Sequence, residues 1–216
     1  MAATVENKTF DATVWEATPG THEPEVITRA GMNTGTDVLS FIAVGGMLLT
    51  LSVINAGWIT IGTVGVIFPV LGTLGAGLAL LAIHAVVSKR LALAGGLGFL
   101  AALAFTYVLL GAPTLSALGD HNITQALGMT FMIWAIVGGL VALALLPRHF
   151  FMGVVLAITD VALWLAMGTY LAPNAVSANT VGYVALLGAV VAFLVGLVGI
   201  LWPDGVRWRG GSLRIG

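Results

Sequence analysis

Six long apolar runs, one after another, constrain this chain most strongly. They occupy approximately residues 37–57, 61–86, 91–111, 125–146, 150–171 and 181–202. Each is close to the ~20 residues that a helix needs to cross a bilayer core of ~30 Å. The runs lack the alternating apolar and polar pattern of membrane barrel strands. The sequence therefore predicts an all-α integral membrane protein with six transmembrane helices.

The composition excludes several classes of protein. Hydrophobic residues make up 59% of the 216 residues and charged residues only 8%, whereas a soluble domain has about 25% charged residues. The formal net charge of −1 provides no basic excess for nucleic-acid phosphates, so we expect no nucleic-acid partner. The absence of cysteine excludes disulfides, thiolate catalysis and cysteine-ligated metal sites.

The basic residues predict the orientation of the helices. Lys89 and Arg90 fall in the second loop, Arg148 falls in the fourth, and the first, third and fifth loops contain no Lys or Arg. Because cytoplasmic loops carry the excess of Lys and Arg, both termini are expected in the cytoplasm. We divide the chain into a cytosolic N-terminal tail (1–36), a six-helix transmembrane domain (37–202) and a cytosolic C-terminal tail (203–216).

Asp160 is the one acidic or basic residue deep inside a predicted span. A carboxylate at that depth costs at least ~2.5–3.5 kcal/mol, so such residues face protein or a water-filled cavity. The helical neighbours Gly153, Ala157 and Trp164 also indicate a face turned away from lipid. Two interpretations remain open: Asp160 borders a solute path, or it binds a neighbouring helix and is structural.

Asn55 and Ser52 lie one helical turn apart at the end of the first span. They can offer hydrogen-bond donors to a polar or anionic solute at a pore mouth. Alternatively, Asn55 closes the helix just before Gly57.

His84 and His149 lie next to basic residues at the predicted cytosolic boundary, and no pair of histidines has metal-ligand spacing. We therefore expect no catalytic residue, cofactor or metal. The 29 glycines, and small residues four apart such as Gly188, Ala192 and Gly196, predict close helix contacts within the chain or between subunits.

Several short motifs occur in a defined order along the spans. Residues 41–47 read Phe-Ile-Ala-Val-Gly-Gly-Met, and the first span ends Asn-Ala-Gly-Trp at 55–58. Leu127-Gly128 precedes Trp134, and Thr159 precedes Leu-Ala-Met-Gly at 165–168. Gly-Tyr opens the sixth span at 182–183, and the chain ends Leu-Arg-Ile-Gly. Over residues 33–216 this order resembles the acetate uptake transporter family, the succinate–acetate permeases.

The chain departs from that family at its signature. The family's Asn-Pro-Ala-Pro-Leu-Gly corresponds to Asn-Thr-Gly-Thr-Asp-Val at 33–38, which keeps only the asparagine. The histidine that usually precedes the first-span asparagine is Ile54. In the family's hydrophobic constriction, the third-span aromatic corresponds to Ala101 or a neighbour, and the fifth-span aliphatic position corresponds to Ile158. The chain is thus similar to a divergent member.

The resemblance implies a multi-pass plasma-membrane transporter or channel for small monocarboxylates, acetate-like and extending to succinate, either proton-linked or passive. It also implies a homo-oligomer, a hexamer with one pore per protomer, whose expected partners are the lipid bilayer and a small carboxylate anion. The expected substrate path comprises Asp160, Asn55, Ser52, Trp134, Ile158 and Thr159.

Two other functions remain open from the sequence. One is a non-transporting membrane subunit that assembles with or stabilises a larger membrane complex. The other, a haem- or quinone-handling membrane enzyme, rests on His84 and His149 alone.

Overall fold

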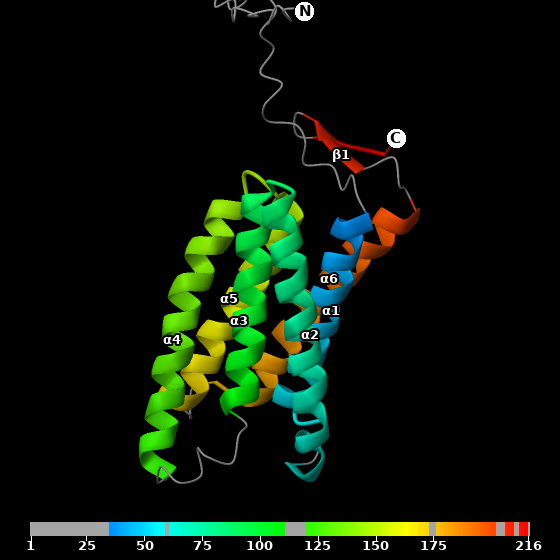
Figure 1. Ribbon diagram of the computed structural model, residues 1–216. Helices are drawn as coiled ribbons and strands as arrows, with labels where there is room; N and C mark the ends of the chain where they lie inside the picture. The colour runs from blue at the N-terminus through cyan, green and yellow to red at the C-terminus, as the bar shows by residue number, and fades with distance from the viewer. Residues whose placement is uncertain are drawn as a thin grey trace, which may run out of the picture.

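The computed structural model describes residues 35–58, 61–110, 120–172 and 176–201 and the backbone of two short strands. Six helices make up most of this described part. The helices are α1 (Gly35–Asn55), α2 (Ile61–Val87), α3 (Leu91–Leu110), α4 (Asp120–Leu145), α5 (Phe150–Leu171) and α6 (Ala178–Leu201), shown in Figure 1. All six are long and apolar enough to cross a membrane. The predicted six-helix all-α fold is confirmed.

The helix boundaries differ from the predicted spans by a few residues. α1 begins two residues earlier than predicted, and α4 begins at Asp120 rather than near residue 125. Two antiparallel strands, β1 (Val206–Arg209) and β2 (Ser212–Ile215), lie in the predicted C-terminal tail and were not expected from the sequence. The N-terminal tail lies outside the described residues as far as residue 34.

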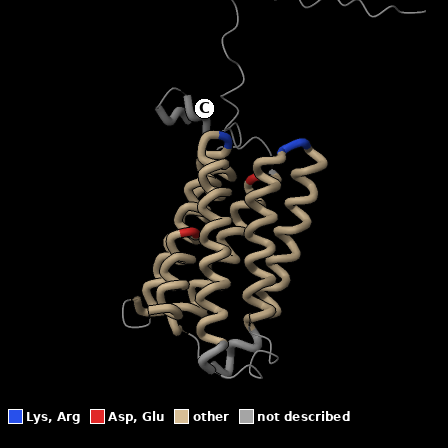
Figure 2. Tube along the Cα trace, turned by 90° about the vertical axis from the view of Figure 1, so that its left-hand side faces the viewer, with Lys and Arg blue, Asp and Glu red and all other residues tan. Residues whose placement is uncertain are grey.

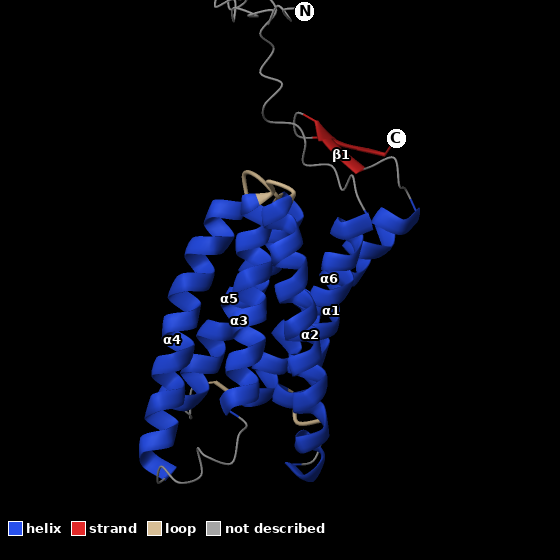
Figure 3. Cartoon of the chain, viewed as in Figure 1, coloured by secondary structure: helices blue, strands red, loops and turns tan. Residues whose placement is uncertain are grey.

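The helices pack mainly as antiparallel neighbours. The most extensive contacts join α1 to α6, α4 to α5, and α2 to α3, and further contacts join α5 to α6 and α1 to α2. α1 begins and α6 ends at one end of the bundle, which also holds the α2–α3 and α4–α5 turns (Figure 3). We call this the terminal end, and the opposite end the loop end.

Close approach at glycines explains why α1 and α6 contact each other so extensively. A Cβ atom on Gly182 would lie 2.3 Å from the backbone nitrogen of Ala56, and one on Gly45 would lie 2.9 Å from the ring of Phe193. α5 meets the chain before it in the same way, because a Cβ on Gly153 would lie 2.7 Å from the backbone nitrogen of Leu146. Small residues thus allow tight packing within this chain.

Basic residues gather at one end of the bundle. Among the described helices and turns, the basic residues Lys89, Arg90 and Arg148 all lie at the terminal end (Figure 2). Large apolar side chains cover the outside of the bundle, for example Leu80, Leu109 and Leu140, which are 65–69% exposed. An apolar perimeter with the basic residues of the helices and turns collected at one end suits a protein surrounded by lipid.

Candidate functional site

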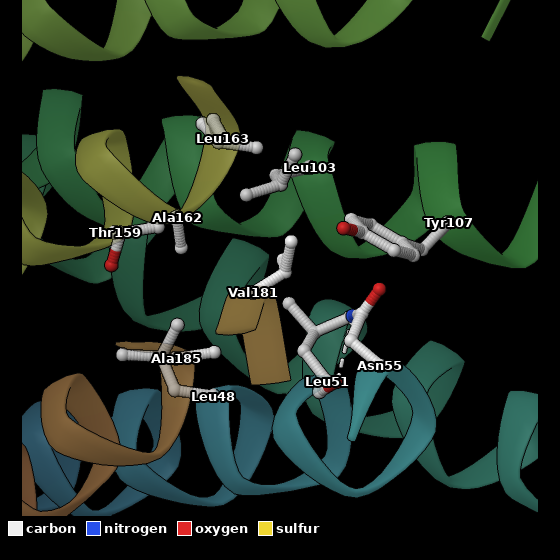
Figure 4. Close-up of a pocket in the computed structure, with 10 residues that line it drawn as sticks. All are labelled: Leu48, Leu51, Asn55, Leu103, Tyr107, Thr159, Ala162, Leu163, Val181 and Ala185. Carbon is white, nitrogen blue, oxygen red and sulfur yellow. Dashed lines mark hydrogen bonds between the residues drawn. The ribbon is translucent and has the colours of Figure 1, made fainter. Parts of the chain in front are cut away.

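A small cavity lies inside the bundle between α1, α3, α5 and α6 (Figure 4). Its walls are mostly aliphatic; the lining residues are Leu48, Leu51, Asn55, Leu103, Tyr107, Thr159, Ala162, Leu163, Val181 and Ala185. The open space within it is about the size of one water molecule. The cavity extends from the middle of the bundle toward the loop end, where Asn55 ends α1.

Three side chains give the cavity wall its polar groups. The Nδ2 of Asn55 donates to the Leu51 carbonyl at 2.8 Å, and the Oγ1 of Thr159 donates to the Val155 carbonyl at 2.9 Å. The Tyr107 phenol interacts with the Asn55 amide across the cavity (Figure 4). None of the ten lining residues is acidic or basic. The cavity therefore offers neutral hydrogen-bonding groups within an apolar wall.

Neighbouring aromatic rings hold Tyr107 in place. Its ring lies 5.4 Å from that of Phe131 on α4, and Phe131 stacks on Tyr170 of α5 at 5.5 Å between ring centroids. This group of rings joins three helices beside the cavity. Because the ring is fixed on one side, the Tyr107 hydroxyl has a defined position toward Asn55.

The end of α1 explains the position of Asn55. The helix stops at Asn55, the backbone nitrogen of Ala56 still donates to the Ser52 carbonyl, and Gly57 has a positive φ of 69°. Both interpretations of Asn55 fit this geometry, because its amide binds the last turn of its own helix and also lies on the cavity wall.

Three other residues of the predicted path lie outside the cavity lining. Ser52 is fully buried and donates to the Leu49 carbonyl at 2.7 Å. Trp134 packs edge-on against Phe99, with 5.4 Å between ring centroids. Ile158 lies against α6, where a Cβ on Gly188 would be 3.4 Å from its Cγ2. Of the six predicted path residues, the cavity is lined by Asn55 and Thr159.

Asp160 lies on the face of α5 that packs against α4. A Cβ atom on Gly138 would lie 3.0 Å from Oδ1 of Asp160, and one on Gly139 would lie 3.2 Å from Oδ2. Oδ1 is buried and has no hydrogen-bond partner among the described residues. The two glycines make room for the carboxyl group between the helices. That Asp160 borders the solute path stays a prediction.

Sequence reasoning missed two features of the site. Tyr107 is not among the predicted path residues, although its spacing from Leu103 places both on one face of α3. A charged cluster at the terminal end was also missed. Nη2 of Arg90 donates to Oδ2 of Asp37 at 2.8 Å, and Nη1 pairs with Oδ1. The two residues are 53 positions apart, so no local pattern reveals the pair.

His149 completes the charged cluster. It precedes α5 and is partly buried, and its side chain makes no hydrogen bond that caps the helix. Burial lowers the pKa of His149, the nearby Arg90 lowers it further, and Asp37 acts in the opposite direction. The described residues contain no group of three or more His, Cys, Asp or Glu placed to hold a metal ion.

Comparison with known proteins identifies the fold. No protein-family model and no curated protein matches the sequence. The structure is similar to that of the bacterial acetate channel SatP, with a TM-score of 0.67 and 16% sequence identity, over 85% of this chain and 99% of the channel. The chain therefore has the fold of this channel.

Proposed function

We propose that the protein is a membrane channel or transporter for small monocarboxylates such as acetate. The observation that carries the proposal is the cavity between α1, α3, α5 and α6, with its neutral polar groups, in a fold shared with an acetate channel. The cavity lies inside the bundle, where four of its helices meet.

The cavity wall fits the chemistry of a short carboxylic acid. Aliphatic side chains such as Leu48 and Leu163 suit the methyl group, while Asn55, Tyr107 and Thr159 can replace water around the carboxyl group. An ionised carboxylate would meet no positive side chain there, and a buried unpaired charge is costly. We therefore propose that acetate crosses together with a proton. Succinate, with a second carboxylate, should cross more slowly.

The path is closed in this structure. The cavity holds about one water molecule. Toward the terminal end, the core is filled by Val44, Leu97, Leu100 and Leu156, all fully buried. Conduction therefore requires these side chains to move apart, and we propose this packed layer as the barrier of the resting state.

We propose that the terminal end faces the cytoplasm and that the protein resides in the plasma membrane. The gathering of Lys89, Arg90 and Arg148 at that end supports this orientation. Reporter fusions at residues 88 and 120 should give signals from opposite sides of the membrane, and matching signals would overturn the topology.

Uptake of labelled acetate into proteoliposomes tests the function. Tyr107→Phe removes only the hydroxyl group that faces the cavity, and we expect uptake to fall by about 2- to 10-fold, as the loss of one hydrogen bond implies. The matched control is Tyr183→Phe, because Tyr183 lies on the outside of α6 and is 55% exposed. Equal uptake by the two variants would remove Tyr107 from the path.

The second candidate is a non-transporting subunit of a larger membrane complex. The altered signature at residues 33–38 and the tightly packed barrier favour it. A folded wild-type protein that takes up no acetate under any pH gradient would support this candidate over the channel.

A further inference from the structure

The charged cluster at the terminal end lies on the same helix faces as the cavity. On α1, the cavity residues Asn55 and Leu48 continue through Val44 and Phe41 to Asp37, in steps of three, four or seven residues. Residues with these spacings share one face of a helix. Asp37 is 4% exposed, so this face remains inside the protein at its terminal end.

α3 and α5 show the same continuity. On α3, the face that carries Tyr107 and Leu103 continues toward the start of the helix through the fully buried Leu100 and Leu97. Arg90 immediately precedes the helix and is in line with this face. The carbonyl of Arg90 accepts the Ala94 amide at 3.0 Å, so its backbone is part of the start of the helix.

On α5, Thr159 is followed by Leu156 and Met152 and then by His149, whose carbonyl accepts the Gly153 amide at 2.9 Å. Asp37, Arg90 and His149 therefore meet where the axis through the cavity reaches the terminal end, beyond the packed apolar layer.

The Asp37–Arg90 pair has the geometry of a carboxylate bound to a guanidinium group. Nη2 of Arg90 donates to Oδ2 of Asp37, and Nη1 lies against Oδ1 as an ion pair; a guanidinium fork that faces two oxygens suits planar carboxylates. The Asp37 side chain, a carboxylate on a single methylene carbon, resembles acetate itself. The Arg90 side chain is 26% exposed and Asp37 lies behind it, so a solute arriving from the terminal end reaches the guanidinium group first.

We propose that Arg90 is the carboxylate-binding residue at the terminal mouth of the path, and that Asp37 occupies it until a small carboxylate anion takes its place. The site is distinct from the uncharged cavity, and its use in transport rests on the proposed function. The exchange releases α1 from α3, which the ion pair joins at this end. Binding of the solute and opening of the mouth are thereby the same event.

The alternative is an ion pair that only stabilises the fold. Asp37 lies in the first turn of α1, where an acidic residue favours the helix. A structural pair and an exchange site differ in one respect. If the pair is only structural, removing Asp37 and removing Arg90 should change the acetate response in the same direction. If the pair is an exchange site, removing Asp37 should strengthen acetate binding and removing Arg90 should abolish it.

The test measures stabilisation of the purified full-length protein by sodium acetate, against sodium chloride at equal ionic strength. We would measure at pH 7.5, where His149, with its lowered pKa, is neutral. Asp37→Asn should reduce the acetate concentration for half-maximal stabilisation by about tenfold or more, as a charge-assisted contact implies. The double variant Asp37→Asn/Arg90→Gln should lose this gain. Arg148→Gln, at an exposed arginine of the same end, is the matched control and should respond like wild type.

Two results would overturn the proposal. One is an acetate response of Asp37→Asn equal to that of wild type, and the other is an acetate response that is weaker than wild type in both Asp37→Asn and Arg90→Gln. If Arg90→Gln does not fold, Arg90→Lys replaces it, because lysine keeps the charge but loses the two-pronged contact. In the Asp37→Asn background, Arg90→Lys should then weaken the acetate response severalfold, and an unchanged response would also overturn the proposal.

Acetate uptake by the same proteins separates this inference from the proposed function. Wild-type uptake with no gain in Asp37→Asn rejects the site and leaves the function standing. An Arg90-dependent gain in a protein that takes up no acetate keeps the site and rejects the function.

Discussion

Asp160 places a carboxyl group in the middle of an apolar helix, opposite two glycines of α4 and outside the cavity lining. Of the two interpretations open from the sequence, we propose the structural one, because the carboxyl group lies between α4 and α5 and not on the cavity wall. Gly138 and Gly139 leave the space that the carboxyl group fills, and any side chain there would meet it.

Replacing Asp160 with asparagine tests this assignment. Asp160→Asn keeps the shape and removes the charge, so we expect an unchanged or higher melting temperature and an unchanged pH profile of acetate uptake. A changed pH profile in a protein that remains folded would instead place Asp160 on the solute path.

His149 should make stability depend on pH. Burial and Arg90 lower its pKa in the folded state, so the unfolded chain binds more protons between that value and about 6.5. Stability should therefore decrease as the pH falls below about 6.5, and this part of the decrease should be absent in His149→Gln. Thermal unfolding of both proteins between pH 7.5 and 5 measures the difference. If the melting temperatures of the two proteins change in parallel with pH, His149 contributes nothing to the pH dependence of stability.

The individual residues of the site were predictable only where a local pattern exposed them. Asn55 stands out at the polar end of a span and Thr159 within a family motif, and both line the cavity. Asp37 and Arg90 are joined only by the packing of α1 beside α3, and nothing near either residue in the sequence indicates its partner.

At the scale of the helices, the bilayer makes the sequence easy to interpret. A span must be about 20 apolar residues long, so length and hydropathy place all six helices within a few residues. Which helices become neighbours is harder to predict. Glycines occur in all six helices, and a glycine that meets a backbone cannot be told from one that meets open space without the fold.

Two glycine substitutions separate these cases. Gly182→Ala would bring a Cβ within 2.3 Å of the Ala56 backbone, which cannot move aside, and we expect a loss of about 1–3 kcal/mol in the free energy of unfolding. Gly72→Ala meets only Val108 at 3.7 Å and should gain about 0.5–1 kcal/mol from its helix preference. Equal stability of the two variants in denaturant titrations would contradict the α1–α6 packing.

The described helices combine an apolar perimeter with an internal cavity and with basic residues at one end. Three glycines, Gly77 of α2 and Gly95 and Gly98 of α3, have no other side chain within 4 Å of where a Cβ would lie. Small residues on the outside of a membrane helix favour close helix association. We therefore predict a symmetric homo-oligomer in which these helices take part.

Native mass spectrometry in mild detergent measures this assembly. We expect a multimer for wild type and smaller species for Gly98→Leu, which adds bulk to the predicted contact. A monomer under every gentle condition would contradict the prediction for wild type. An unchanged multimer in Gly98→Leu would exclude that face of α3.

Blocking the cavity tests the account most directly. Ala185 lines the cavity from α6, and Ala185→Phe should fill it, whereas Leu187→Phe on the same helix is 55% exposed and should leave it open. In proteoliposomes, wild type and Leu187→Phe should take up labelled acetate at similar rates. A folded Ala185→Phe should reduce the uptake to near the level of empty liposomes. Uptake that persists undiminished in Ala185→Phe would contradict a path through this cavity.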